Sequence, residues 1–324
     1  MKFFILVIAL TLSACSSTKR TIIAENQNYL IVQARGVDDY PALAKDYLGD
    51  PGFASVIQRY NPGLEVLNGS EIAIPKKNFY SSSVFANGYQ RIPILCYHQF
   101  TAKTKGQNGM VVPLSEFEQQ MSYLKDNGYH VLPLRDVRLF LDGKKPLPDK
   151  TVVLTVDDGY ESFYTVAYPV LKKYGFASTM FIYPDFVGGG VALDWDQIRL
   201  LDKDPLVDFQ SHSKTHDSLS IRPGGEESSS YTKRLKVEVE ETDRILKGNI
   251  GRQAVHFAYP YGNTSKELVE LLNKNEYDLA VTVKKGRNAS FSSPFLLYRT
   301  MIYGGNSFQA FKRSLKVFEK ADLR

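Results

Sequence analysis

From residue 91 onward the chain alternates short apolar segments with amphipathic ones, and this pattern restricts its fold more than any other feature. Strands are expected at 92–97, 152–156 and 178–182, with helices around 117–127 and 167–174. Parallel strands need a crossover of about a dozen residues, which a helix usually provides. The alternation therefore predicts an α/β domain with a largely parallel sheet or barrel.

A smaller compact pattern precedes this domain at residues 29–77. We expect a strand at 29–32, helical stretches around 43–47 and 53–60, and a closing strand at 71–75. This β-α-α-β order, with "VIQRYNPGL" and "LNGSEIAIPK", resembles a LysM module. In that family the module binds glycans that contain N-acetylglucosamine. Since the helix start reads "GVDDYPAL", glycan binding and a role as a structural spacer both remain open. Residues 78–90 are expected to form a linker.

The N-terminus carries a targeting signal. Lys2 precedes an apolar run at 3–12, which is shorter than the roughly 20 residues that a membrane-spanning helix needs. We interpret 1–14 as a cleaved signal peptide. The ending "LSAC" resembles a bacterial lipobox, which implies lipidation of Cys15, and Ser16 points to the outer membrane, facing the periplasm. Residues 15–28 would then be a tether. An ordinary secretory signal with a chance cysteine is the alternative.

Charge and cysteine content narrow the function classes. The 40 basic and 35 acidic residues are interspersed and give a net charge of +5, so nucleic-acid binding is not indicated. If Cys15 is acylated, Cys96 is the only other cysteine, and no intrachain disulfide can form. Because Cys96 lies in an apolar segment, we expect a buried strand cysteine rather than a nucleophile.

A pair of acidic residues ends the most β-branched segment of the chain. The run 152–156 is followed directly by Asp157, Asp158 and Gly159. Two carboxylates at the end of a buried strand are costly unless a cation or a hydrogen-bonded turn compensates for the lost hydration. Active sites of α/β barrels lie at this end of the strands. Taken alone, however, Asp-Asp-Gly is also a common turn.

Two histidines follow another expected strand, at 206–209. His212 and His216 are four residues apart, a spacing that places both on one face of a helical turn. Two imidazoles and one carboxylate can hold a divalent metal and leave positions open for water and substrate. Zinc suits this donor set best, although cobalt, nickel or iron could occupy it. Asp217 is a possible outer partner of the histidines.

Aromatic residues mark two further segments. Tyr259 and Tyr261 belong to "FAYPYG", which we expect to form a tight aromatic wall that contacts substrate. Trp195, the only tryptophan, lies between Asp194 and Asp196. It could stack on a sugar ring at the rim of a pocket, which we favour, or fill the core.

Four of these pieces together resemble a known family. "TVDDGY", "SHSKTH", "LDW" and "FAYPYG" are similar to motifs of polysaccharide deacetylases with a NodB-type domain, carbohydrate esterase family four. The resemblance covers about residues 91–310 of the expected domain at 91–324. It implies a distorted (β/α) barrel, with Asp157 as general base and the Tyr261 N–H stabilising an oxyanion. The metal ligands that it implies are Asp158, His212 and His216.

The sequence departs from the family in two places. Ala258 stands where many relatives carry an arginine that orients the catalytic aspartate, and no histidine after His256 can be the usual general acid. We predict that Arg299 pairs with Asp157, and that His98 contributes to substrate binding or proton transfer. The "YH" at His98, together with "FAYPYG", resembles a subgroup that includes poly-β-1,6-N-acetylglucosamine deacetylases.

These features predict a metal-dependent N-deacetylase of an N-acetylglucosamine polysaccharide that releases acetate. An exopolysaccharide such as poly-β-1,6-N-acetylglucosamine is slightly favoured as substrate over peptidoglycan. A non-catalytic glycan-binding envelope lipoprotein is an alternative of a different class. A phosphohydrolase is disfavoured because the chain has no Gly-rich or Arg-rich phosphate cradle.

Overall fold

The computed structural model describes residues 20–26, 29–76, 83–85, 87–106, 108–145 and 147–321. Two compact units divide the chain at Lys77 and Asn78. The expected signal peptide and Cys15 lie outside the described residues, as does part of the expected linker. Within the described ranges, no helix has both the length and the apolar character needed to cross a membrane.

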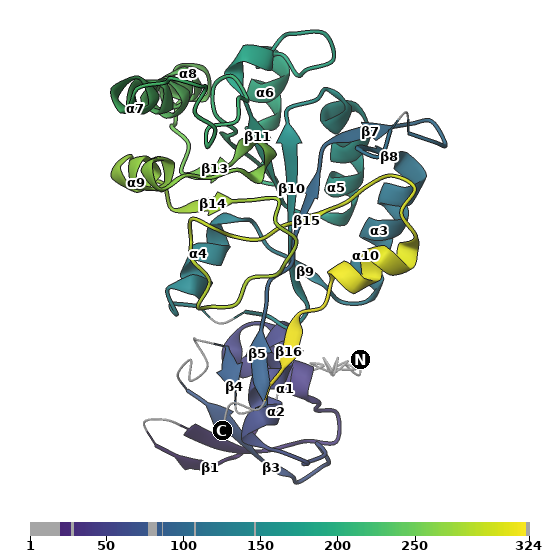
Figure 1. Ribbon diagram of the computed structural model, residues 1–324. Helices are drawn as coiled ribbons and strands as arrows, with labels where there is room; N and C mark the ends of the chain where they lie inside the picture. The colour runs from purple at the N-terminus through teal and green to yellow at the C-terminus, as the bar shows by residue number, and fades with distance from the viewer. Residues whose placement is uncertain are drawn as a thin grey trace, which may run out of the picture. The chain divides into compact units, whose positions relative to one another are not determined.

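The first unit is a three-stranded antiparallel sheet packed on two helices (Figure 1). Its elements are β1 (Ile22–Glu25), β2 (Tyr29–Gln33), α1 (Tyr40–Leu48), α2 (Ala54–Tyr60) and β3 (Glu71–Pro75). The Asp39 side chain accepts a hydrogen bond from the Ala42 N–H and so begins α1, and Gly49 ends it with a φ of 86°. The expected strand and helix positions are therefore present, while the LysM resemblance stays a prediction.

The second unit is built on a curled parallel sheet. Among the described residues it has eight strands, in the order β14-β13-β12-β11-β10-β6-β15, with β9 pairing onto β10. The bounds are β6 (Ile94–Tyr97), β9 (His130–Val131), β10 (Thr151–Asp158), β11 (Ser178–Ile182), β12 (Val207–Ser211), β13 (His256–Ala258), β14 (Leu279–Val281) and β15 (Thr300–Met301). This half-barrel confirms the expected α/β domain with a parallel sheet and is consistent with a NodB-type barrel.

Helices cover the outside of this sheet. In Figure 1, α3 (Leu114–Asp126), α5 (Tyr168–Tyr174) and α10 (Phe308–Ser314) lie on one side of the strands. On the other side lie α7 (Ser228–Lys236), α8 (Thr242–Ile250) and α9 (Lys266–Lys274). Two further α-helices among the described residues of this unit are α4 (Arg135–Leu141) and α6 (Trp195–Leu201).

Short strands complete the second unit. An antiparallel sheet joins β4 (Val84–Phe85), β5 (Gly88–Gln90) and β16 (Phe318–Lys320), which brings the two ends of this unit together. A parallel pair joins β7 (Gln99–Thr101) and β8 (Val111–Pro113).

Strand β10 is buried on both faces, which explains its β-branched composition. Val152, Leu154 and Val156 belong to the larger core cluster, whereas Val153 belongs to a second cluster on the opposite face. A parallel strand covered on both faces is apolar throughout, and each such side chain contributes about 1.5–3 kcal/mol when buried. The polar residues at its carboxyl end are therefore held on a rigid support.

Candidate active site

The carboxyl ends of adjacent parallel strands gather the predicted site residues. Asp158 pairs in register with Ile182, Ile182 with Ser211, and Ser211 with Phe257. The segments that follow these strands therefore start at the same edge of the sheet. This places the two aspartates of β10 beside the histidine segment after β12 and the aromatic turn after β13.

The three predicted metal ligands form one cluster. Nε2 of His212 lies 3.6 Å from Oδ1 of Asp158, and Nε2 of His216 lies 3.4 Å from the same oxygen. Nδ1–H of His212 donates to the carbonyl oxygen of Ala258 at 2.7 Å, which fixes the ring with Nε2 facing the cluster. Burial lowers the pKa of His212 to about 3. Its imidazole is therefore neutral, the form that binds metals.

The cluster fits a divalent metal. Its three donor atoms lie within 4.8 Å of one another. Oδ1 of Asp158 is buried and has no hydrogen-bond partner among the described residues. Burial, followed by the charge of Asp157, raises the pKa of Asp158 to about 7. A bound cation would give this buried oxygen a partner and would be coordinated by the two neutral imidazoles. This donor set suits zinc and neighbouring transition metals.

The segment from His212 to His216 is not helical, so the expected helical turn is wrong. The chain instead uses positive φ angles at Ser213 (64°) and His216 (66°), and the His216 N–H donates to Oγ of Ser213 at 3.1 Å. This loop brings the two rings to 4.7 Å. Together with Asp158 and Tyr261, these are four of the seven described non-glycine residues with positive φ. Such strain persists where the surroundings enforce it, often at functional sites.

Asp157 forms the predicted ion pair with Arg299. The guanidinium donates to both carboxylate oxygens, at 2.7 and 2.6 Å, and also to Oγ1 of Thr155 and the carbonyl of Thr282. Arg299 is fully buried. Burial alone would raise the pKa of Asp157, but Arg299 outweighs it and holds that pKa well below its usual range. The aspartate is thus an oriented anion at neutral pH.

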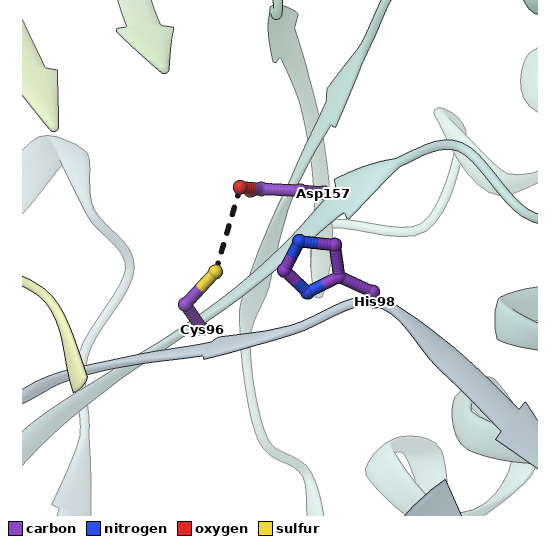
Figure 2. A group of neighbouring side chains, drawn as sticks. All are labelled: Cys96, His98 and Asp157. Carbon is purple, nitrogen blue, oxygen red and sulfur yellow. Dashed lines mark hydrogen bonds between the residues drawn. The ribbon is translucent and has the colours of Figure 1, made fainter. Parts of the chain in front are cut away.

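Two further side chains lie beside the Asp157 carboxylate, one from β6 and one from the residue that follows this strand. Figure 2 shows Cys96 and His98 beside Asp157, with Sγ–H donating to Oδ2 at 3.4 Å. Burial raises the pKa of the thiol, so it remains a protonated donor. Burial also lowers the pKa of His98, which is therefore neutral at pH 7.

Cys96, His98 and Asp157 could form a second metal site on distance alone, since their donor atoms also lie within 4.8 Å. The charges argue otherwise. Asp157 is already paired with a buried cation, Arg299, and a metal would have to displace the protonated thiol's hydrogen. We therefore assign these side chains to the surroundings of the aspartate.

Tyr261 occupies the turn Pro260–Gly262 with a left-handed φ of 57°. Tyr261 is 62% exposed, and its ring lies 4.8 Å from the ring of His216. The N–H groups of Gly262 and Asn263 bond within the turn. The Tyr261 N–H has no hydrogen-bond partner among the described residues, so it is available to a ligand at this edge.

The other two aromatic predictions fare differently. The Tyr259 ring is fully buried against Phe257 and its hydroxyl donates to the Phe295 carbonyl at 2.9 Å. The prediction that the Tyr259 side chain contacts substrate is therefore wrong, because this side chain is part of the core. Trp195 begins α6 and its partly buried ring packs against the main core. Its role in binding substrate stays a prediction.

Sequence reasoning missed the contact between Cys96 and Asp157. The available signal was strand alternation, because residues i and i+2 face the same side and Cys96 precedes His98 by two. It also missed Tyr183, whose ring packs 5.0 Å from that of His216. Nothing near Tyr183 in the sequence indicates this contact, which depends on the end of β11.

Comparison with known proteins points to one family. Residues 144–280 match the family model described as polysaccharide deacetylase. This range includes both aspartates and both histidines. The comparisons support a polysaccharide deacetylase domain in this chain. A polysaccharide deacetylase is a hydrolase that acts on amide bonds. Cys96, His98 and Arg299 lie outside the matched range.

Three relatives extend the comparison. The Bacillus subtilis (strain 168) protein YxkH, whose name provisionally assigns polysaccharide deacetylation, is 29% identical over 230 residues, 70% of this chain and 77% of the relative. The poly-beta-1,6-N-acetyl-D-glucosamine N-deacetylase of Escherichia coli (strain K12) is 26% identical over 273 residues, 74% of this chain but only 40% of the relative. The Streptococcus pyogenes deacetylase PplD, solved in complex with acetate, aligns with a TM-score of 0.63 and 25% identity, covering 70% of this chain and 98% of that chain.

Proposed function

We propose that this chain is a zinc-dependent N-deacetylase of an N-acetylglucosamine polymer, with poly-β-1,6-N-acetylglucosamine favoured as substrate. The observation that carries the proposal is the meeting of two different carboxylates at one strand end. Asp158 lies with His212 and His216, while Asp157 is held by Arg299. One carboxylate can thus hold a metal while its neighbour handles a proton. The name of the Escherichia coli relative supports the choice of polymer.

Asp158, His212 and His216 would hold the metal. When bound, a divalent metal supplies Lewis-acid chemistry, polarising the acetamide carbonyl and lowering the pKa of water. Asp157 accepts the proton of the attacking water as general base. Arg299 keeps that carboxylate anionic and fixes its direction, since both oxygens are hydrogen-bonded.

The tetrahedral intermediate carries a negative oxygen, to which the Tyr261 N–H donates. Breaking the C–N bond releases acetate, and the departing nitrogen takes up one proton to become an amine. After the first step Asp157 carries that proton, and a nitrogen of His98 lies within 4.8 Å of its carboxylate. Because His98 is neutral, it either relays this proton or binds the sugar while Asp157 donates directly.

The remaining sequence predictions complete the proposal. Lipidation at Cys15 would anchor the chain to the outer membrane, facing the periplasm, and the first unit would hold the polymer or act as a spacer. The lipobox-like "LSAC" supports the anchor. Mass spectrometry of the mature N-terminus tests it, because a diacylglyceryl group must be present on Cys15 and absent from a Cys15→Ala variant.

Acetate release tests the activity. The purified chain, stripped of metal and then given zinc, is incubated with poly-β-1,6-N-acetylglucosamine and, in parallel, with peptidoglycan. Peptidoglycan is the second candidate because the LysM-like pattern and the expected envelope anchor fit it equally well. We expect zinc-dependent release from the first polymer and none from Asp157→Asn. Tight zinc binding without release from either polymer would favour a glycan-binding protein instead.

A further inference from the structure

A buried carboxylate outside the proposed catalytic set interrupts an apolar helix stripe. Glu238 is 4% exposed, in a π-helical turn (Val237–Glu241) that joins α7 to α8. The buried residues along the same helix are Tyr231, Leu235, Val239, Thr242 and Leu246. An acidic side chain at such a position costs free energy unless specific donors satisfy it.

The donors come from the segment between the two histidines. Oε2 of Glu238 accepts hydrogen bonds from the backbone N–H groups of Lys214 and Thr215, at 2.9 and 3.0 Å, and Oε1 accepts one from the Thr215 hydroxyl at 2.8 Å. In the part of the chain that the structure describes, no lysine or arginine forms an ion pair with Glu238. Its charge is therefore balanced by the loop itself.

This loop requires an external support. Residues 212–216 have no regular secondary structure, and Ser213 and His216 adopt left-handed φ angles that non-glycine residues rarely keep without external contacts. Lys214 also pairs with Asp185 at 2.7 Å, but through an exposed ammonium group. The buried side chain that contacts this loop is Glu238, which accepts hydrogen bonds from backbone N–H groups between His212 and His216.

The π-helical turn explains how Glu238 reaches the loop. Glu238 and Val239 are consecutive, yet both are buried. An extra residue in a helical turn lets two neighbours face inward, and such turns are frequent at functional sites. Val239 packs into the main core while Glu238 points to the loop.

We propose that Glu238 is a positioning residue of the metal site, clamping the 213–215 backbone so that both imidazoles face Asp158. The proposal rests on the metal-dependent function proposed above. Glu238 itself contacts no ligand atom. Its effect is on how well the site is organised before metal binds.

Zinc affinity of the full chain tests this inference, measured on metal-stripped protein by competition with a chromophoric chelator. Glu238→Gln keeps the volume but replaces the carboxylate by a neutral amide, so the hydrogen bonds from the Lys214 and Thr215 N–H groups lose their charge assistance, and we expect about a tenfold loss of affinity. Glu240→Gln is the matched control, because it removes an exposed acid from the same helical turn. We expect this control to stay within about twofold of wild type.

Cobalt gives a signature that a purely structural role would not change. Co²⁺-loaded Glu238→Gln should show a weaker, shifted visible absorption than wild type, while Glu240→Gln should match wild type. Should Glu238→Gln fail to fold, Thr215→Val removes one of the three hydrogen bonds with little effect on the helix. We expect about a threefold loss of zinc affinity from it.

Wild-type zinc affinity in Glu238→Gln, or in Thr215→Val when Glu238→Gln does not fold, overturns the inference. Absence of zinc binding by the wild-type chain would also overturn it. The result is separable from the proposed activity, because a chain that binds zinc in a Glu238-dependent way but releases no acetate supports the clamp and contradicts only the deacetylase.

Discussion

The two aspartates of this site differ in which group compensates their negative charge. Asp157 and Asp158 are adjacent, but Arg299 pairs only with Asp157. The pKa values separate accordingly: Arg299 holds that of Asp157 low, whereas burial raises that of Asp158 to about 7. Two neighbouring carboxylates whose pKa values differ in this way are suited to different tasks.

Replacing Arg299 by lysine should impair turnover more than metal binding. Lysine keeps the charge but cannot donate to both oxygens of Asp157 at once. We expect kcat to fall about 100-fold, because a small misplacement of a reacting group has this effect. Zinc affinity should change little. Arg287→Lys, which alters an arginine bonded to the Ser314 carbonyl, is the control for the substitution itself. Unaltered kcat in Arg299→Lys would remove the pairing from the mechanism.

The thiol of Cys96 should matter as a hydrogen-bond donor. Cys96→Ser retains a donor to Asp157, whereas Cys96→Val has similar bulk and none. We expect kcat of the serine variant within about threefold of wild type and that of the valine variant lowered about tenfold, the effect of losing roughly 1.4 kcal/mol. Steady-state acetate release measures both. Equal rates for valine and wild type would show that the contact is only packing.

At the scale of elements, rigid strands carry the aspartates while short irregular turns aim the other groups. The loop after β12 and the turn after β13 both use left-handed non-glycine residues. This division lets metal ligands and the oxyanion donor be disturbed separately, because they belong to different segments.

Gly262→Ala should separate oxyanion stabilisation from metal binding. Gly262 has a φ of 71°, and an added Cβ would lie 2.7 Å from the backbone nitrogen of Val283. The turn must shift, and the Tyr261 N–H with it. We expect kcat to fall at least about 100-fold, as when one oxyanion donor is lost, with zinc affinity nearly unchanged. Gly251→Ala is the control: its φ of 79° adds the same strain, but nothing lies within 4 Å. A parallel loss of zinc affinity would contradict this separation.

At the scale of the whole molecule, the two units have separate sheets and cores. The first unit's core cluster includes Val32, Leu43 and Ile74, and none of its members belongs to the clusters of the second unit. All described residues of the proposed catalytic centre lie in the second unit.

A chain that begins at Asn78 should therefore fold and bind zinc like the full chain. Its kcat on a short soluble oligosaccharide should be within about twofold of the full-length value, since independent units contribute additively. Any contribution of the first unit to polymer binding should appear only as a higher KM on long or insoluble substrate. A fragment that cannot bind zinc would contradict this independence.

Metal and pH should be linked in the stability of the whole fold. The pKa of Asp158 rises on folding from 3.8 to about 7, so its stabilising contribution is full below pH 3.8 and is lost as pH rises through about 7. His212 acts oppositely: its pKa falls from 6.5 to about 3, so its contribution is present above pH 6.5 and is lost as pH falls toward 3. Between pH 6 and 8 Asp158 should lower the stability of the metal-free chain by about 1.4 kcal/mol, while His212 offsets part of this loss as the unfolded state releases its proton.

Urea unfolding of the wild type and of Asp158→Asn in the presence of a chelator measures the Asp158 contribution as the difference between their pH dependences. Zinc should abolish it, because the metal binds the ionised carboxylate, and Asp158→Asn should abolish it without metal. An apo Asp158→Asn variant with the same pH dependence of stability as the apo wild type would show that Asp158 is solvated or otherwise paired.

Much of the fold and part of the site could be predicted from local pattern. The β-branched run before Asp157 predicts a strand buried on both faces, and the strand end then places polar residues at one edge. The histidine spacing predicted a shared ligand site but the wrong local structure, since both a helical turn and the observed loop can bring residues four apart together. Tyr259 was misplaced because an aromatic turn does not reveal which ring faces inward.

The sequence by itself determined the α/β class, the strand ends and the residues able to hold a metal, because these follow from local hydrophobic period and side-chain chemistry. Only the tertiary structure decided which groups neutralise one another. Arg299 is 142 residues from Asp157, Cys96 is 61 residues from it, and Glu238 is 24 residues from Lys214. Such pairs form because a curled parallel sheet brings distant strand ends to one edge, and this register is a property of the whole sheet rather than of any segment.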